Sequence, residues 1–117
     1  MLPLDTQLAL EQLLGKQEPA ADQVLPSVAC IYFTARWCGA CKRLDLETIE
    51  AATPGVTWYK CDVDINTYSP GFCGVRSIPS FMLIVNKRPI GPFTSSDTAK
   101  VVAWVSANKL ITEARGA

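Results

Sequence analysis

The chain has 117 residues, enough for one domain with a single hydrophobic core and no disulfide scaffold. Its 11 basic and 11 acidic side chains cancel, so its charge gives no reason to expect a nucleic acid or an anionic membrane as partner. No stretch is apolar over the length that a transmembrane helix needs. We therefore expect a single domain over residues 1–117, in which an N-terminal helix and loop occupy residues 1–27.

The first predicted helix covers residues 5–15. Asp5 or Thr6 can cap its start. Its leucines have the spacing of one face of an amphipathic helix: Leu8, Leu10, Leu13 and Leu14. Little of the chain remains before this helix, so a leading strand must be very short. Residues 17–27 contain two prolines among small and polar side chains, which indicates a connecting loop.

A central strand is predicted at residues 28–34, which are nearly all apolar or aromatic, as in a parallel strand that is covered on both faces. Residues 42–52 are compatible with a helix. Pro54 and Gly55 end that helix, because the residue before proline avoids the helical region and glycine readily forms the exit turn. Residues 56–61 then form a second buried strand.

The C-terminal half begins with residues 67–74, where proline and glycine allow only a short or broken helix. Residues 81–85 are apolar and, together with Ser80, predict a strand over residues 80–85. Residues 86–89 predict a turn, and residues 90–93 a short strand that can pair with the previous one as a hairpin.

A last helix is predicted after Ser95 or Ser96, either of which can cap it, with Asp97 in its first turn. Its apolar face consists of Val101, Trp104, Val105 and Ile111. The alternation of helices and strands in one small domain implies an α/β fold, with a mixed central sheet and helices on both faces.

Cys38 and Cys41 stand where the predicted central strand becomes a helix. Unpaired N–H groups and the partial positive charge of a helix start stabilise a thiolate, and Cys38 is better placed to benefit. The three-residue spacing brings Cys41 round one turn, close enough to attack a mixed disulfide formed on Cys38. Cys38 is therefore the candidate nucleophile and Cys41 the candidate resolving thiol.

The cysteines also allow simpler interpretations. The two cysteines could simply pack in the core. They could also form half of a zinc site, but the chain has no histidine to complete one. An iron–sulfur cluster shared between two subunits is a further alternative. Cys30 and Cys61 lie in predicted strands and are expected in the core. Cys73 lies in a predicted loop, and we expect an ordinary, partly exposed thiol, with a regulatory or dimer-forming thiol as alternative.

The start of the chain lacks the features of a targeting signal. It has no basic segment, it is not rich in arginine, and Asp5 and Glu11 interrupt its apolar residues. The five cysteines are an odd number, and only one pair has a redox spacing. We therefore expect a cytoplasmic location or, alternatively, the mitochondrial matrix or another reducing organelle.

Two motifs in order make the chain resemble the thioredoxin family. A strand leads to Trp-Cys-Gly-Ala-Cys-Lys at residues 37–42 and a helix, and Arg-Ser-Ile-Pro at residues 76–79 leads into a later strand. The resemblance covers residues 28–111 and implies a thioredoxin fold. It also implies that the bond between Ile78 and Pro79 is cis and that the backbone around Ile78 hydrogen-bonds an extended peptide.

The resemblance assigns roles to the surroundings of the cysteine pair. The substrate-binding residues that it implies are Trp37, Gly39, Ala40, Ile78 and Pro79. Pro79 also keeps adventitious metal off the sulfurs, which argues against a shared cluster. Lys60 matches a lysine that is buried behind the site, and Lys60 and Tyr32 are the candidates for handling the proton or tuning the pair.

Tyr32 stands where thioredoxins usually carry an aspartate that handles the proton of the resolving thiol. A tyrosine with its ordinary pKa near 10 cannot act as a carboxylate base at neutral pH. We therefore expect Tyr32 to be a core residue, and we expect the proton of Cys41 to leave through water or another group. A tyrosine at this position is similar to the tryparedoxin and nucleoredoxin branch.

Three further positions depart from the family. Ala40 replaces a proline and supplies a backbone N–H near the sulfurs, which favours the Cys38 thiolate and a more oxidising disulfide. Ser95 replaces a glycine that lies against substrates, and we expect it to narrow the choice of partner. Leu46 replaces a helix-kinking proline, so we expect a straighter helix.

Four cations are expected near the pair in this fold: Arg36, Lys42, Arg43 and Arg76. They either lower the pKa of the nucleophilic thiol and attract acidic substrates, or form an ordinary solvated rim.

The first functional hypothesis is a protein-disulfide reductase. Its expected partners are disulfide-containing proteins and a reductase or small dithiol as electron donor, with no metal or organic cofactor. We expect a monomer with no nucleic acid or membrane partner. The second hypothesis is a thioredoxin-fold binding or redox-sensing subunit without general reductase activity. A third is an oxidant or isomerase, which Ala40 favours and the lack of a secretory signal disfavours.

Overall fold

The computed structural model describes the backbone of residues 1–116 and the side chains of residues 1–109. The elements in chain order are β1 (Leu2–Pro3), α1 (Gln7–Leu13), β2 (Val28–Thr34), the 3₁₀ helix η1 (Ala40–Arg43), α2 (Leu46–Ala52), β3 (Thr57–Asp62), α3 (Tyr68–Phe72), β4 (Ser80–Val85), β5 (Arg88–Thr94) and α4 (Thr98–Gly116). The side chain of Ile111, which the sequence places on the apolar face of the last helix, lies outside the described residues.

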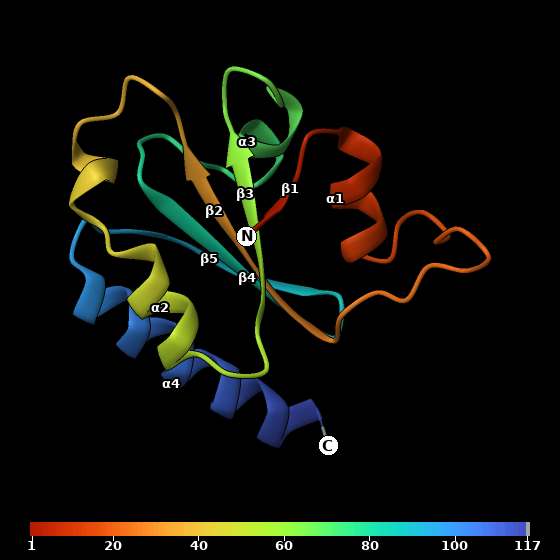
Figure 1. Ribbon diagram of the computed structural model, residues 1–117. Helices are drawn as coiled ribbons and strands as arrows, with labels where there is room; N and C mark the ends of the chain where they lie inside the picture. Colours follow the sequence, from red (N-terminus) through yellow and green to blue (C-terminus); the bar gives the residue numbers. More distant parts are fainter. Residues whose placement is uncertain (117) are drawn as a thin grey trace.

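The five strands form one mixed sheet in the order β1-β3-β2-β4-β5 (Figure 1). β1 and β2 run parallel to β3, whereas β4 runs antiparallel to both β2 and β5. Helices α1 and α3 lie on one face of the sheet and helices α2 and α4 on the other (Figure 1). The predicted fold class, a mixed sheet with helices on both faces, is confirmed.

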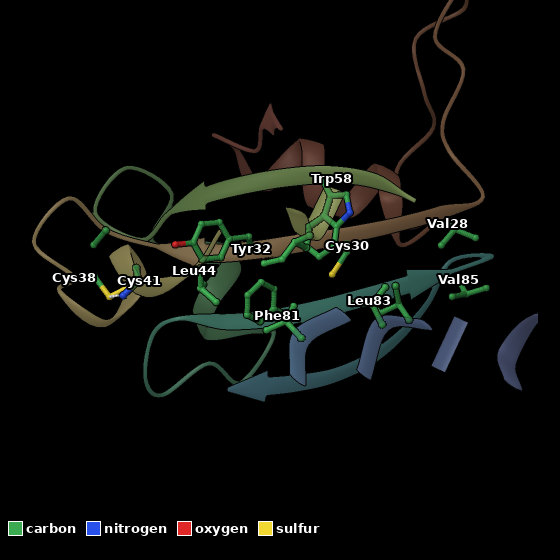
Figure 2. Close-up of a cluster of buried hydrophobic side chains, with 14 residues drawn as sticks. Val28, Cys30, Tyr32, Cys38, Cys41, Leu44, Trp58, Phe81, Leu83 and Val85 are labelled. Carbon is green, nitrogen blue, oxygen red and sulfur yellow. Dashed lines mark hydrogen bonds between the residues drawn. A yellow bond between two sulfur atoms is a disulfide. The ribbon is translucent and has the colours of Figure 1, made fainter. Parts of the chain in front are cut away.

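β2 is the central strand, as predicted, and each of its residues is buried. Its side chains alternate between two cores, because successive residues of a strand point to opposite faces. Tyr32 and Cys30 belong to the core under α2 and α4, whereas Ile31 and Phe33 belong to the core under α1 and α3. We call these the α2/α4 core and the α1/α3 core. Figure 2 shows the α2/α4 core, with the cysteine pair at one end.

The segment after the cysteine pair differs from the prediction of one straight helix over residues 42–52. The chain forms a 3₁₀ turn at Ala40–Arg43, leaves helical geometry, and restarts at Leu46. The Asp45 side chain caps α2 by accepting a bond from the Thr48 N–H at 3.1 Å. The Asp45 N–H donates to the Thr98 hydroxyl at 3.0 Å. This bond to the start of α4 stabilises the interruption between η1 and α2.

The last helix is capped by Asp97, not by Ser95 or Ser96. The Lys100 N–H donates to the Asp97 carboxylate at 3.1 Å, and the Ser95 hydroxyl instead accepts a bond from the Asp97 N–H at 3.1 Å. On the apolar face that the sequence predicts, Val101 and Val105 are fully buried, and the half-buried Trp104 packs against the same core.

The remaining elements follow the sequence with small changes. Thr6 caps α1 as expected, but Leu8 is exposed and not part of its buried face. The β4–β5 hairpin is confirmed, with Asn86 and Lys87 in the left-handed region at φ of 49° and 70°, as a two-residue hairpin turn needs. Among the described residues, no helix combines the length and apolarity that crossing a membrane requires.

Candidate active site

Cys38 and Cys41 follow the carboxyl end of β2, where open α/β sheets place their sites. They form a disulfide with their Cα atoms 5.4 Å apart. Both side chains are nearly buried, at 4% and 6% exposure, and belong to the α2/α4 core. The three-residue spacing that the sequence analysis singled out is therefore a geometry in which the two sulfurs react with each other.

The Cys38 sulfur accepts a backbone hydrogen bond, from the Cys41 N–H at 3.1 Å. Such a donor favours the thiolate over the thiol. This N–H lies at the start of the helical segment, as expected, but it is not the N–H of Ala40. The donor belongs to Cys41, and the helical segment at the pair is a 3₁₀ turn of only four residues.

The Ile78–Pro79 bond is cis, as the resemblance implied. Pro79 is buried, and the half-buried Ile78 packs against both cores. The buried Ser80 hydroxyl donates to the Ser77 carbonyl at 2.6 Å and so ties the turn before the proline to the start of β4. The loop before β4 is thus anchored at Ser80, and its Ile78 packs against the core that contains the cysteine pair.

Trp37 is 68% exposed and its indole N–H donates to the Asp64 carboxylate at 2.8 Å. Beside it lies a hollow of about 380 Å³. The lining residues are Trp37, Val63, Pro70, Val75, Arg76, Ser77 and Ile78. Sequence reasoning missed Asp64, although the turn residues Asp62 to Asp64 after β3 place a carboxylate at the same edge of the sheet as the pair.

Tyr32 is a buried residue, as expected, and stacks on Phe81 with ring centroids 5.4 Å apart. Burial raises the pKa of Tyr32, and the nearby Thr34 side chain acts in the opposite direction. A phenol with a raised pKa does not provide a base at neutral pH, which agrees with the sequence analysis.

Lys60 is exposed, so the expectation of a buried lysine is wrong. It is the cross-strand neighbour of Tyr32. Since a tyrosine offers no charge to pair with, burying the ammonium beside it would be costly. Lys60 instead lines a small hollow of about 230 Å³, together with Thr34, Ala35, Arg36 and Asp62.

The other three cysteines are buried, and burial raises their pKa: well above the usual value for Cys30, to about 12 for Cys61 and to about 11 for Cys73. The core positions predicted for Cys30 and Cys61 are confirmed. The expected partial exposure of Cys73 is wrong, because this residue ends α3 and packs in the α1/α3 core. These thiols are poor nucleophiles.

Four cations lie close to the pair in the chain or line the hollow beside Trp37, where Asp64 also lies. Arg36, Lys42, Arg43 and Arg76 are all exposed, and none of them forms an ion pair with the described side chains. Gly39 is exposed and Ala40 half-buried. Within residues 1–109, no group of three side chains has the composition of a metal site.

The chain is similar to known thioredoxins. The family model described as Thioredoxin matches residues 19–107. The thioredoxin of Chlamydia trachomatis is 36% identical over 76 residues, 63% of this chain and 74% of that protein. The thioredoxin of Malassezia sympodialis is 32% identical over 95 residues, 78% of this chain and 87% of that protein. Thioredoxin O1, mitochondrial, of Arabidopsis thaliana is 31% identical over 97 residues, 78% of this chain and 48% of that protein.

Solved structures show the same fold. Mitochondrial thioredoxin 3 of Saccharomyces cerevisiae, in the oxidised form, superposes with a TM-score of 0.77 at 24% identity, covering 92% of this chain and 94% of that one. The thioredoxin of Fasciola hepatica superposes with a TM-score of 0.74 at 24% identity, covering 92% and 98%.

Proposed function

The chain belongs to the thioredoxin family and is a thiol-disulfide oxidoreductase, and we propose that it reduces protein disulfides with Cys38 as the nucleophile and Cys41 as the resolving thiol. The observation that carries this assignment is the bond from the Cys41 N–H to the Cys38 sulfur. Because the N–H stabilises negative charge on Cys38, this sulfur is the better thiolate of the pair.

The proposed reaction has two exchanges. The Cys38 thiolate attacks a substrate disulfide, forms a mixed disulfide and displaces one substrate thiolate. Cys41 then attacks the Cys38 sulfur, which releases the second substrate thiolate and leaves the Cys38–Cys41 disulfide. A reductase or a small dithiol supplies the two electrons that open this disulfide again. The scheme requires no metal or organic cofactor.

For substrate binding we propose an extended peptide that crosses the pair along the cis-proline loop. The backbone at Ile78 provides strand-like hydrogen bonds, as a sheet edge does. The exposed Trp37 and the hollow beside it are suited to an apolar substrate side chain. Gly39 and Ala40, which have no side chain or a small one, and the buried Pro79 complete the set of substrate-binding residues that we propose.

We propose that acidic substrates are favoured. The cations Arg36, Lys42, Arg43 and Arg76 are exposed around the pair and carry no ion pair with the described side chains. Unpaired charge of one sign around a reactive site speeds the encounter with partners of the opposite sign, and salt weakens that effect.

The compartment that we propose is a reducing one, either the cytoplasm or an organelle matrix. Support comes from the three buried free thiols and from the similarity to Thioredoxin O1, mitochondrial, and to Thioredoxin M2, chloroplastic, both of Arabidopsis thaliana. We also propose that the chain acts as a single domain and as a monomer. A binding subunit without reductase activity is not favoured.

The test is the reduction of insulin disulfides with dithiothreitol as donor. We expect turnover by the wild type, loss of turnover in Cys38→Ser, and covalent trapping of substrate by Cys41→Ser. Cys73→Ala is the matched control, because it removes a thiol outside the site and is expected to keep the activity. A Cys38→Ser protein as active as the wild type would show that Cys38 is not the nucleophile.

A further inference from the structure

We propose that Ser80 and Thr94 are positioning residues for the substrate, because their hydroxyls form a chain of hydrogen bonds that sets the direction of the Ile78 N–H. The inference deepens the proposed function and rests on it, since the Ile78 backbone is there the partner of an extended peptide. The two hydroxyls act through the peptide unit between Ser77 and Ile78 and not by contact with the substrate.

The Ile78 backbone is open for pairing. Within the described part of the chain, neither its N–H nor its C=O bonds to another backbone group. The loop that carries Ile78 lines the hollow of about 380 Å³ together with Trp37, the residue next to Cys38. An extended peptide that reaches the pair beside Trp37 can therefore form strand-like bonds with Ile78.

The Ser80 hydroxyl holds the carbonyl of the peptide unit that supplies this N–H. It donates to the Ser77 carbonyl at 2.6 Å, and no backbone group among the described residues binds that carbonyl. The peptide unit between Ser77 and Ile78 is trans and planar, so its N–H points opposite to its C=O. A bond that fixes the Ser77 carbonyl therefore also fixes the Ile78 N–H.

The direction of the second bond in the chain follows from the first. The hydroxyl oxygens of Ser80 and Thr94 lie 2.6 Å apart, and either could donate if this bond stood alone. A hydroxyl has one proton, and Ser80 gives its proton to Ser77. Thr94 is therefore the donor to Ser80. A hydroxyl that accepts a bond becomes a stronger donor, so Thr94 strengthens the bond from Ser80 to the carbonyl.

The sheet brings the two hydroxyls together. Ser80 is the first residue of β4 and Thr94 the last of β5, and the two are direct partners in the antiparallel register. Ser80 also pairs with Phe33 of β2, so both neighbouring strands hold its backbone. Ser80 is fully buried, whereas Thr94 is exposed. Removal of the Thr94 hydroxyl should therefore leave the core intact.

The test compares a substrate that has a peptide backbone with one that has none. Insulin is reduced with dithiothreitol as donor, which gives kcat and KM. In a second assay the reduced protein is mixed with 5,5′-dithiobis(2-nitrobenzoate) by stopped flow, which gives the rate of attack of Cys38 on a disulfide without a backbone. The variants are Ser80→Ala and Thr94→Val, which keeps the shape of threonine without its hydroxyl. Thr94→Ser restores the donor, and Thr57→Val, at the end of β3 away from the pair, is the matched control.

We expect Ser80→Ala to raise the KM for insulin about three- to tenfold, the contribution of one hydrogen bond, with little change in kcat. Thr94→Val should raise the KM about two- to threefold, because Ser80 keeps its bond to the carbonyl but loses its own donor. The double variant should be no worse than Ser80→Ala, since the two hydroxyls form one chain. Thr94→Ser and Thr57→Val should match the wild type, and the rate with the small disulfide should be the same in every variant.

Three results would overturn the inference. A KM in Ser80→Ala no higher than in Thr57→Val would show that the hydroxyl does not affect peptide binding. An equal slowing with both substrates would indicate a displaced cysteine pair. A Thr94→Ser protein that behaves like Thr94→Val would show that the Thr94 hydroxyl is not the donor. If Ser80→Ala does not fold, Thr94→Val decides by the same criteria. A wild type that does not reduce insulin, or a Cys38→Ser protein that does, would instead refute the proposed function.

Discussion

The indole N–H of Trp37 and the carboxylate of Asp64 form a hydrogen bond of 2.8 Å that joins the loop before the cysteine pair to the loop after β3. Trp37 is 68% exposed, so packing alone does not fix its ring. The bond holds the ring as one wall of the hollow beside Ile78. An exposed aromatic side chain thereby becomes an ordered part of a binding surface.

Loss of the hydrogen bond between Trp37 and Asp64 should affect substrate binding more than the rate of the chemical step. For Asp64→Ala we expect the KM for insulin to rise about two- to fivefold with little change in kcat, because the Trp37 N–H loses its charged acceptor at an exposed site. Trp37→Phe removes the same bond from the other side. The double variant should therefore be no worse than the poorer single variant; additive effects would show that the two residues act independently.

The thiols should fall into two classes of reactivity. In the reduced protein at pH 8, iodoacetamide should label Cys38 rapidly, and Cys30, Cys61 and Cys73 only after unfolding. A thiol with a pKa of about 11, as for Cys73, is about 0.1% thiolate at pH 8, and this fraction rises about tenfold per pH unit. Mass spectrometry of the labelled peptides gives the rates. Equal labelling of Cys73 and Cys38 would contradict the buried position of Cys73.

The cap of α4 should contribute measurable stability. Asp97→Ala should lower the free energy of unfolding by about 1 kcal/mol, because the Lys100 N–H loses its acceptor. Asp97→Asn should keep most of this stability, because its side-chain oxygen can still accept the Lys100 N–H. Ser96→Ala is the control and should change stability by less than about 0.5 kcal/mol. Urea unfolding measures the stability of all three variants. If Ser96→Ala lost more stability than Asp97→Ala, Ser96 and not Asp97 would be the cap.

Asn66 should be one of the polar residues that the fold depends on most. Its buried side-chain amide donates to the Leu4 carbonyl at 3.1 Å and to the Ser69 hydroxyl at 2.8 Å, and it accepts a bond from the Ser69 N–H at 3.1 Å. Asn66→Ala should cost about 2–4 kcal/mol, because several buried partners lose their bonds at once. Gln17→Ala, on an exposed loop, should cost less than about 0.5 kcal/mol. Thermal unfolding of both variants provides the comparison.

Two strands could be predicted to the residue. Residues 28–34 and 80–85 are nearly continuous apolar runs, and the structure confirms both with the same bounds, as β2 and β4. A strand that is covered on both faces buries nearly all of its side chains and is therefore mostly apolar. The apolar run then marks where the strand begins and ends. The cysteine pair and the cis-proline were also located from sequence, since each belongs to a short motif next to one of these strands.

The helix after the pair shows where sequence reasoning failed. The residues of 42–52 are good helix formers, yet the helix breaks at Asp45. The Asp45 N–H is held by Thr98, which lies 53 residues away in the chain. Helix propensity depends on neighbouring residues and contains no information about such a distant contact. Here the tertiary contact outweighs the preference of these residues for a continuous helix.

The amino-acid sequence by itself determined the fold class, the central strand and the identity of the reactive pair, because periodicity and motif spacing reflect interactions between near neighbours in the chain. Only the tertiary structure decided that Lys60 is exposed, that Cys73 is buried and that the Asp64 carboxylate accepts a hydrogen bond from Trp37. Each of these depends on which distant segments the sheet brings together. Burial, pKa and hydrogen-bond partners depend on that arrangement and cannot be predicted from one segment of the sequence alone.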